Sequence, residues 1–366
     1  MQTLVVDWGA ASTKAGIAGE DAPSLIVPTS QDGGARDSSE LAIEEVADLW
    51  RLVFGPQHLC VDTTEHMLIT AEAALAPKIH RERCCQLAFE EFGVAGYYVG
   101  TSAVLSLYAA GRTTGIVVDC GHHSTTLAPI YEGYAFPHAI KKLPYGGIDT
   151  TKKLIDLLND SPFRTWRRLS KTAGADLREV GKLKERVCQV ALDVATERDA
   201  AHQLHARWDA LHAATANEAL FLSRLPKELS QIVLTNVLDG EPVGITSYTL
   251  PDGTVLRVGE EVFGCVETYF DPTYCHSTSS AQSSATVPLG RSPVIRADPS
   301  LSSTHTSASA EVSDADRVEE GPPMGLAAFV SDAIQLIDDD LRKDLYNNIV
   351  LSGMLPSLTS GVKPCL

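Results

Sequence analysis

An internal repeat constrains the fold of this chain more than any other feature. Leu4–Gly9 is an apolar run that ends in Asp-x-Gly, and Ile116–Gly121 repeats the same pattern. After each run comes a short stretch of small or hydroxyl-bearing residues, and then a second apolar segment. Each copy therefore predicts a strand, a tight glycine turn and a second strand. Repetition at so long an interval indicates two related halves rather than a short-period solenoid.

Strands and helices alternate along the rest of the sequence. Met67–Thr70 predicts a buried strand, and Tyr248–Leu256 predicts a hairpin with a Pro-Asp-Gly turn. Apolar residues recur at helical spacing in several segments. The segments predicted to be helical are Glu40–Phe54, Lys78–Phe92, Thr101–Ala110, Gly147–Leu158 and Lys182–Leu225. This alternation predicts the α/β class.

Charge and composition exclude several classes of partner. Lys and Arg number 30 against 47 Asp and Glu, which gives a net charge of −17. A surface of that sign argues against direct nucleic-acid binding and against anionic membranes. No apolar run is long enough to span a bilayer. The eight cysteines include no C-x-x-C pair, so we expect reduced thiols in a cytoplasmic or nuclear protein rather than a zinc site.

The repeated turns point to phosphate chemistry. A glycine turn lets backbone N–H groups approach phosphate oxygens closely, and two such turns can hold a polyphosphate from both sides. Asp7 and Asp119 stand two residues before the turn glycines and can orient the waters of a hydrated Mg²⁺. Lys14 can add a positive charge beside the phosphates.

Five stretches, in order along nearly the whole chain, resemble actin and the actin-related proteins. They are Asp7–Pro23, Leu105–Pro137, Lys184–Asp193, Ser247–Gly253 and Arg342–Gly353. The resemblance implies an actin-like ATPase-domain fold, in which two related α/β halves enclose a nucleotide cleft. It also implies ATP or ADP with Mg²⁺ as the ligand.

By this resemblance, specific residues surround the nucleotide, and Asp7 and Asp119 hold the metal through waters. The first phosphate turn would supply Gly9, Ala10, Ala11, Ser12 and Lys14. The second would supply Gly121, His122, His123, Ser124 and Thr125. The ribose and adenine would lie near Gly147, Lys184, Glu185, Gly353 and Met354.

The chain departs from the family in the residues that contact the ligand. Ala10 stands where the family has a serine that bonds the γ-phosphate, and His122 and His123 replace an Asp-Gly pair. Met354 replaces a glycine near the adenine. The paired histidines are not predicted to form a metal or acid–base site, because adjacent side chains rarely converge.

Two further departures concern hydrolysis. Ser102 replaces the glutamine that positions the attacking water, and Thr126 replaces a histidine that polarises it. Because positioning and charge stabilisation carry most of this reaction, we expect very weak or absent ATP hydrolysis and name no catalytic residue.

The expected domains follow the same template. Residues 1–140 form a first actin-like domain, in which the short connection Thr29–Glu40 replaces an outer subdomain. Residues 141–274 form a second domain with an enlarged helical insertion, and the Ser/Thr-rich stretch 275–323 is expected to be disordered. Residues 324–366 return to the second domain, and the chain is expected to lack the usual C-terminal part of the first.

Three functions are compatible with this pattern. The favoured one is a non-polymerising actin-related subunit or cap of a cytoskeletal, dynactin-like complex in the cytoplasm. One alternative is a nuclear actin-related subunit of a chromatin-remodelling complex, and another is an active actin-like ATPase that forms filaments. A sugar or acetate kinase is disfavoured, because no segment indicates a phosphoryl-acceptor site.

Overall fold

A computed structural model describes residues 2–29, 41–161, 168–191, 193–196, 198, 199, 203, 246–250, 253, 255–271 and 325–353. These residues form two compact units. Unit 1 comprises the described residues of 2–146 and 325–353, and unit 2 comprises those of 147–271. The predicted α/β class is confirmed. The predicted domain boundaries stay a prediction, and the stretch 275–323 and the replaced subdomain connection after Thr29 lie outside the described residues.

The first repeat builds one of two five-stranded sheets in unit 1, which we call sheet A. Its strands are β1 (Thr3–Trp8), β2 (Ser12–Ile17), β3 (Leu25–Pro28), β4 (Met67–Glu72) and β5 (Gly96–Thr101). The spatial order is β3-β2-β1-β4-β5. β1, β2 and β3 form an antiparallel meander, whereas β4 lies parallel to β1 and β5 parallel to β4. The carboxyl ends of β1, β4 and β5 therefore share one edge of the sheet.

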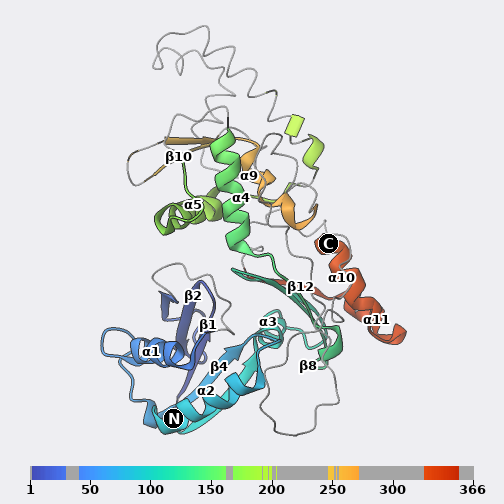
Figure 1. The fold of residues 1–366 in the computed structure, drawn as a ribbon. Coiled ribbons are helices and arrows are strands. Elements are labelled where there is room, and N and C mark those ends of the chain that lie inside the picture. Colours follow the sequence, from blue (N-terminus) through green and yellow to red (C-terminus); the bar gives the residue numbers. More distant parts are fainter. Residues whose placement is uncertain are drawn as a thin grey trace, which may run out of the picture. The chain divides into compact units, whose positions relative to one another are not determined.

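Helices α1 (Ile43–Phe54) and α2 (Lys78–Glu90) pack on one face of sheet A, and the short helix η2 (Thr63–Glu65) precedes β4 (Figure 1). Alternate residues of β1 point into this interface, as the period of two requires. Trp50 of α1 is fully buried at the centre of the core and lies 5.6 Å, ring to ring, from Trp8. The first repeat is thus anchored by aromatic packing beneath its turn.

The second repeat builds sheet B, also in unit 1. Its strands are β6 (Gly115–Cys120), β7 (Thr125–Tyr131), β8 (Tyr134–Ala135), β9 (Lys141–Leu143) and β12 (Ile349–Gly353), and η3 (Pro137–Ala139) precedes β9. β6 and β7 form an antiparallel hairpin, and β12 lies parallel to β6. Each sheet therefore places a parallel strand beside the first strand of its hairpin. Both hairpins predicted from the internal repeat are confirmed.

Three helices complete the described part of unit 1: α3 (Ser102–Ala109), α10 (Leu326–Gln335) and α11 (Asp339–Tyr346). α3 begins directly after β5 and buries Leu107 against Val117 and Ala128 of sheet B. An ion pair between Lys141 and Asp332 joins β9 to α10.

The described elements of unit 2 are α4 (Gly147–Asp160), α5 (Gly174–Val187), β10 (Thr246–Thr249), β11 (Val255–Val258), α9 (Glu261–Gly264) and η4 (Glu267–Tyr269). The helical segment predicted over Lys182–Leu225 is interrupted after Val187, and residues 194–196, 198, 199 and 203 are helical again, while the rest of the segment beyond them lies outside the described residues. Cys188 has an extended backbone, and its thiol lies 3.6 Å from that of Cys265, so buried side-chain packing ends the helix. None of the helices in the described ranges has the length and apolarity needed to cross a membrane.

Candidate functional site

The first turn exposes backbone donors at its tip. Gly9 closes the β1–β2 hairpin by donating its N–H to Ser12 O at 3.0 Å. Within the described residues, neither Ala10 nor Ala11 donates its N–H to another backbone group. The Thr29 hydroxyl donates to Gly9 O at 2.6 Å and so ties the turn to the residue that follows β3. Unpaired N–H groups at a braced turn fit a phosphate ligand.

Asp7 and Lys14 face each other across the same hairpin. They are cross-strand partners in the β1–β2 register, two residues below the turn. Burial raises the pKa of the Asp7 carboxyl, and the positive charge of Lys14 partly offsets this rise. The Lys14 side chain is exposed. A carboxylate that has lost part of its hydration gains from a nearby cation, so this position fits a hydrated Mg²⁺.

The second turn reproduces the backbone of the first. Gly121 donates its N–H to Ser124 O at 2.9 Å, and Asp119 faces Thr126 across the hairpin. Thr126 thus occupies the position that Lys14 holds in the first hairpin. The Thr125 hydroxyl is buried and donates to Tyr145 O at 2.9 Å. The buried Cys120 precedes the glycine, and desolvation raises the pKa of its thiol to about 12.

His122 and His123 lie in edge-to-face contact at the second turn. Their ring centroids are 4.7 Å apart and both residues are half-buried, so these adjacent side chains do converge. The backbone of Gly146 passes so close that a Cβ there would lie 2.5 Å from His122 O. Across the described ranges, no three His, Cys, Asp or Glu side chains are grouped as a metal centre would need.

The end of β12 lies beside the second turn. Ser352 pairs with Asp119, and Gly353 pairs with Cys120. Gly353 has φ +82°, and a Cβ on it would lie 2.3 Å from Cys120 O and 2.9 Å from an Asp119 carboxylate oxygen. Only glycine fits there, because the Cys120 backbone and the Asp119 carboxylate already fill the place that a side chain would take.

Helix α3 links the edges that carry the two turns. Ser102, its first residue, directly follows β5 at the carboxyl edge of sheet A. One helical turn later, Ser106 Oγ lies 3.1 Å from Ser352 Oγ at the carboxyl end of β12 in sheet B. The first half of α3 therefore adjoins the edges from which both turns project.

The predicted adenine-side residues fall mostly in unit 2. Lys184 is buried and donates its ammonium to Gly147 O at 2.7 Å and to the Thr151 hydroxyl at 2.8 Å. Desolvation lowers the pKa of this ammonium. The structure therefore brings Lys184 and Gly147 together and leaves the neighbouring Glu185 exposed. Met354 lies outside the described residues.

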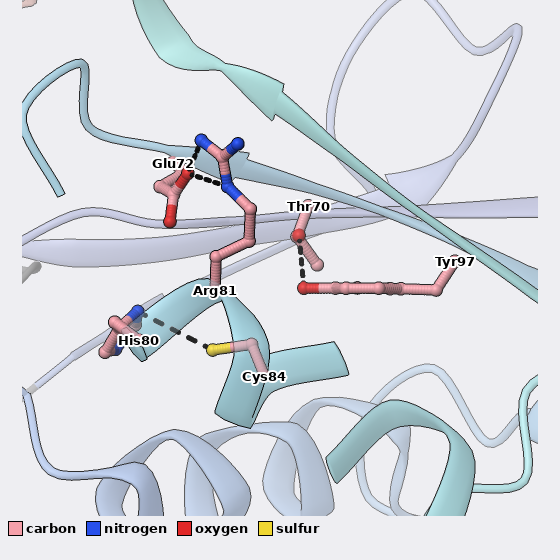
Figure 2. A network of polar contacts seen from close by, with 6 residues as sticks. All are labelled: Thr70, Glu72, His80, Arg81, Cys84 and Tyr97. Atoms are coloured by element: carbon pink, nitrogen blue, oxygen red, sulfur yellow. Dashed lines mark hydrogen bonds and ion pairs between the residues drawn. The ribbon is translucent and has the colours of Figure 1, made fainter. Parts of the chain in front are cut away.

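One charged pair at the site was missed from the sequence. Glu72 ends β4 one residue after Ala71, which pairs with Asp7, and its side chain is only 5% exposed. Arg81 of α2 donates to this carboxylate, with Nε at 2.7 Å (Figure 2). A glutamate ending an apolar strand, with an arginine in the next helix, is the signal that could have identified the pair.

Figure 2 also shows the groups that support this edge. The Thr70 and Tyr97 hydroxyls lie 2.9 Å apart between β4 and β5, and His80 Nδ1 lies 3.6 Å from Cys84 Sγ within α2. Burial raises the pKa of the Cys84 thiol to about 12 and also raises that of the Tyr97 phenol. The Cys84 thiol and the Tyr97 phenol therefore stay neutral near pH 7, and the ion pair of the network is Glu72 with Arg81.

Comparison with known protein families gives one match. The model of the Actin family matches residues 36–363, which is most of the chain. The match includes the second hairpin and β12, whereas the first hairpin lies before its start.

Proposed function

The chain belongs to the actin family, and on this premise we propose that it is a divergent actin-related protein that binds ATP or ADP with Mg²⁺ and hydrolyses ATP very weakly or not at all. The observation that carries the proposal is the matched pair of turns. Gly9 and Gly121 make the same N–H···O bond to a serine three residues on, and an aspartate precedes each glycine by two residues. Unrelated hairpins have no reason to share both features.

The proposed contacts follow the chemistry of each turn. The N–H groups of Ala10 and Ala11 and the charge of Lys14 would hold phosphate oxygens from the first turn. Asp7 and Asp119 would orient the waters of Mg²⁺. A bound Mg²⁺ would supply positive charge that neutralises part of the phosphate charge. Gly353 would bring the end of β12 against Cys120 and Asp119, because a larger residue does not fit there.

Weak hydrolysis follows from the side chains near the start of α3. The hydroxyl of Ser102 is short and cannot reach as far as an amide on two methylenes. Thr126 lacks a ring nitrogen to polarise a water. Because phosphoryl transfer depends on oriented water and on stabilisation of the γ-phosphate charge, both changes act against turnover.

We further propose a role in a hetero-assembly rather than in a filament of this protein alone. A filament repeats one heterologous contact at every subunit. The connection Thr29–Glu40 is too short to rebuild the outer subdomain that supplies one side of this contact in actin. A subunit or cap of a cytoplasmic, dynactin-like cytoskeletal complex fits best, and a nuclear chromatin-remodelling subunit is the second candidate.

The test is the nucleotide content of the purified full chain, with phosphate release and sedimentation measured on the same sample. We expect bound ATP or ADP, phosphate release near the background rate, and no pelleting with ATP and Mg²⁺. Turnover comparable with that of actin, together with regular filaments in electron micrographs, would instead establish the filament-forming ATPase.

A further inference from the structure

The second turn carries two imidazoles where the first carries two methyl groups. His122 and His123 occupy the positions of Ala10 and Ala11, in a turn with the same closing hydrogen bond. We infer that this histidine pair is a protonation-dependent phosphate contact, which makes the second turn bind polyphosphate more tightly as the pH falls. The inference deepens the proposed nucleotide-binding function and rests on it.

The spacing of the rings explains why an anion would change their protonation. With ring centroids 4.7 Å apart, two protonated imidazoles would repel each other. A phosphate beside the pair attracts both protons and reduces this repulsion. Binding should therefore take up protons, and the affinity should rise as the pH falls through the range in which histidine titrates.

Groups around the turn have different titration ranges. Asp119 precedes the turn, and Lys142 of β9 pairs with Thr126. Tyr145 accepts the Thr125 hydroxyl at its carbonyl, and β12 contributes Ser352 and Gly353, neither of which carries a charge. Carboxyl, phenol and ammonium groups ordinarily titrate well below or well above pH 5.5–8. Burial raises the pKa of Asp7 above this ordinary range, so the pH dependence is assigned to the imidazoles only by its loss when both are replaced.

The first turn provides an internal reference. Its tip has no titratable side chain, because Ala10 and Ala11 end in methyl groups, and its charge comes from Lys14. Lysine keeps its charge throughout the range in which histidine titrates. In a site made of two turns of the first kind, the pH dependence of phosphate binding between pH 5.8 and 7.8 would come from protonation of the ligand and of Asp7, whose pKa burial raises.

The test is calorimetric titration of the full chain with Mg-ATP and with tripolyphosphate, at pH 5.8 and at pH 7.8. The matched variants are H122N/H123N, which keeps side-chain hydrogen bonding without titrating, and H138N, which changes an exposed imidazole outside the turn. Circular dichroism and thermal melting establish that each variant is folded. Repeating the titrations in buffers of different ionisation enthalpy gives the number of protons taken up.

We expect the wild type and H138N to bind both ligands more tightly at pH 5.8, by about tenfold for each imidazole whose pKa rises by one unit on binding. H122N/H123N should lose this increase and the matching proton uptake, and ligand protonation cancels in the comparison. Mg-ATP binding with the same pH dependence in all three proteins would overturn the inference and leave the proposed function standing. Histidine-dependent binding of tripolyphosphate without binding of Mg-ATP would support the inference and contradict the nucleotide function. Binding of neither ligand at either pH would overturn both.

Discussion

The β1–β2 and β6–β7 hairpins share a backbone design but differ in what stands beside each turn. In sheet A the strand parallel to β1 ends in Glu72, a buried carboxylate held by Arg81 (Figure 2). In sheet B the strand parallel to β6 ends at the matching place in Gly353, which has no side chain. One turn thus lies beside a buried, paired carboxylate, and the other lies beside a glycine whose backbone packs tightly against Cys120.

The side chains at the two turn tips also differ, and here the larger polar groups belong to the second turn. The first tip is small and neutral, with Lys14 supplying a charge from the strand below. The second tip carries His122 and His123, with uncharged Thr126 at the position of Lys14. The comparison shows that a duplicated hairpin can keep its closing N–H···O bond while its basic side chains move from the strand to the tip.

The largest expected effect comes from adding a side chain at the tightly packed Gly353. Gly353→Ala adds a left-handed backbone penalty and a Cβ within 2.3 Å of Cys120 O, so we expect a loss of about 3 kcal/mol or more in unfolding free energy. Gly19→Ala is the matched control, since Gly19 also has positive φ but has no atom within 4 Å of a Cβ. Gly19→Ala should lower the free energy of unfolding by about 1 kcal/mol. Equal losses in urea denaturation would show that the crowding at Gly353 is unimportant.

A smaller loss of stability is expected when a threonine beside either turn is replaced by valine, and the two replacements should differ in size. Thr125→Val removes the hydroxyl that donates to Tyr145 O, and we expect a loss of about 1–2 kcal/mol in the free energy of unfolding. Thr13→Val should cost less, because Thr29 keeps its bond to Gly9 O after losing the Thr13 hydroxyl. The measurement is the denaturation midpoint of each variant. A larger loss for Thr13→Val would reverse our view of which turn depends more on its threonine.

The smallest effect is a gain in stability. The pKa of Asp7 is raised by burial, so the folded state holds its proton more tightly than the unfolded state does. Stability then falls as the pH rises from the ordinary aspartate range through the raised pKa, and Asp7→Asn removes this loss. Without ligand at pH 7.5 we expect a melting temperature higher by roughly 1–3 °C, a shift that about 1 kcal/mol produces in domains of this size.

The advantage of Asp7→Asn should vanish below the ordinary aspartate pKa, where the wild-type carboxyl is protonated in both states. Melting curves at pH 3 and pH 7.5 make this comparison. A variant less stable than the wild type at pH 7.5 would mean that the Asp7 carboxylate stabilises the folded chain.

The sequence predicted the duplicated hairpins, α1 to α4 and the Asp and Gly positions of both turns, because apolar periodicity and glycine turns are local signals. It did not predict the Glu72–Arg81 pair, the fit of Gly353 against Cys120 or the contact between His122 and His123. These depend on which strand lies beside which, and on how a turn aims its side chains. The helical segment predicted from Lys182 is interrupted at Cys188, where packing against Cys265 overrides helical propensity.

The central claim is that both turns contribute to one nucleotide site, and titration of the ligand-free full chain with Mg-ATP tests it most directly. We expect saturable binding of one nucleotide per chain. Asp7→Ala and Asp119→Ala should each weaken binding at least about tenfold, the size expected for loss of one charged interaction. Asp340→Ala, an exposed carboxylate on α11, should leave it unchanged. Binding that depends on one turn alone, or no saturable binding, would contradict the claim.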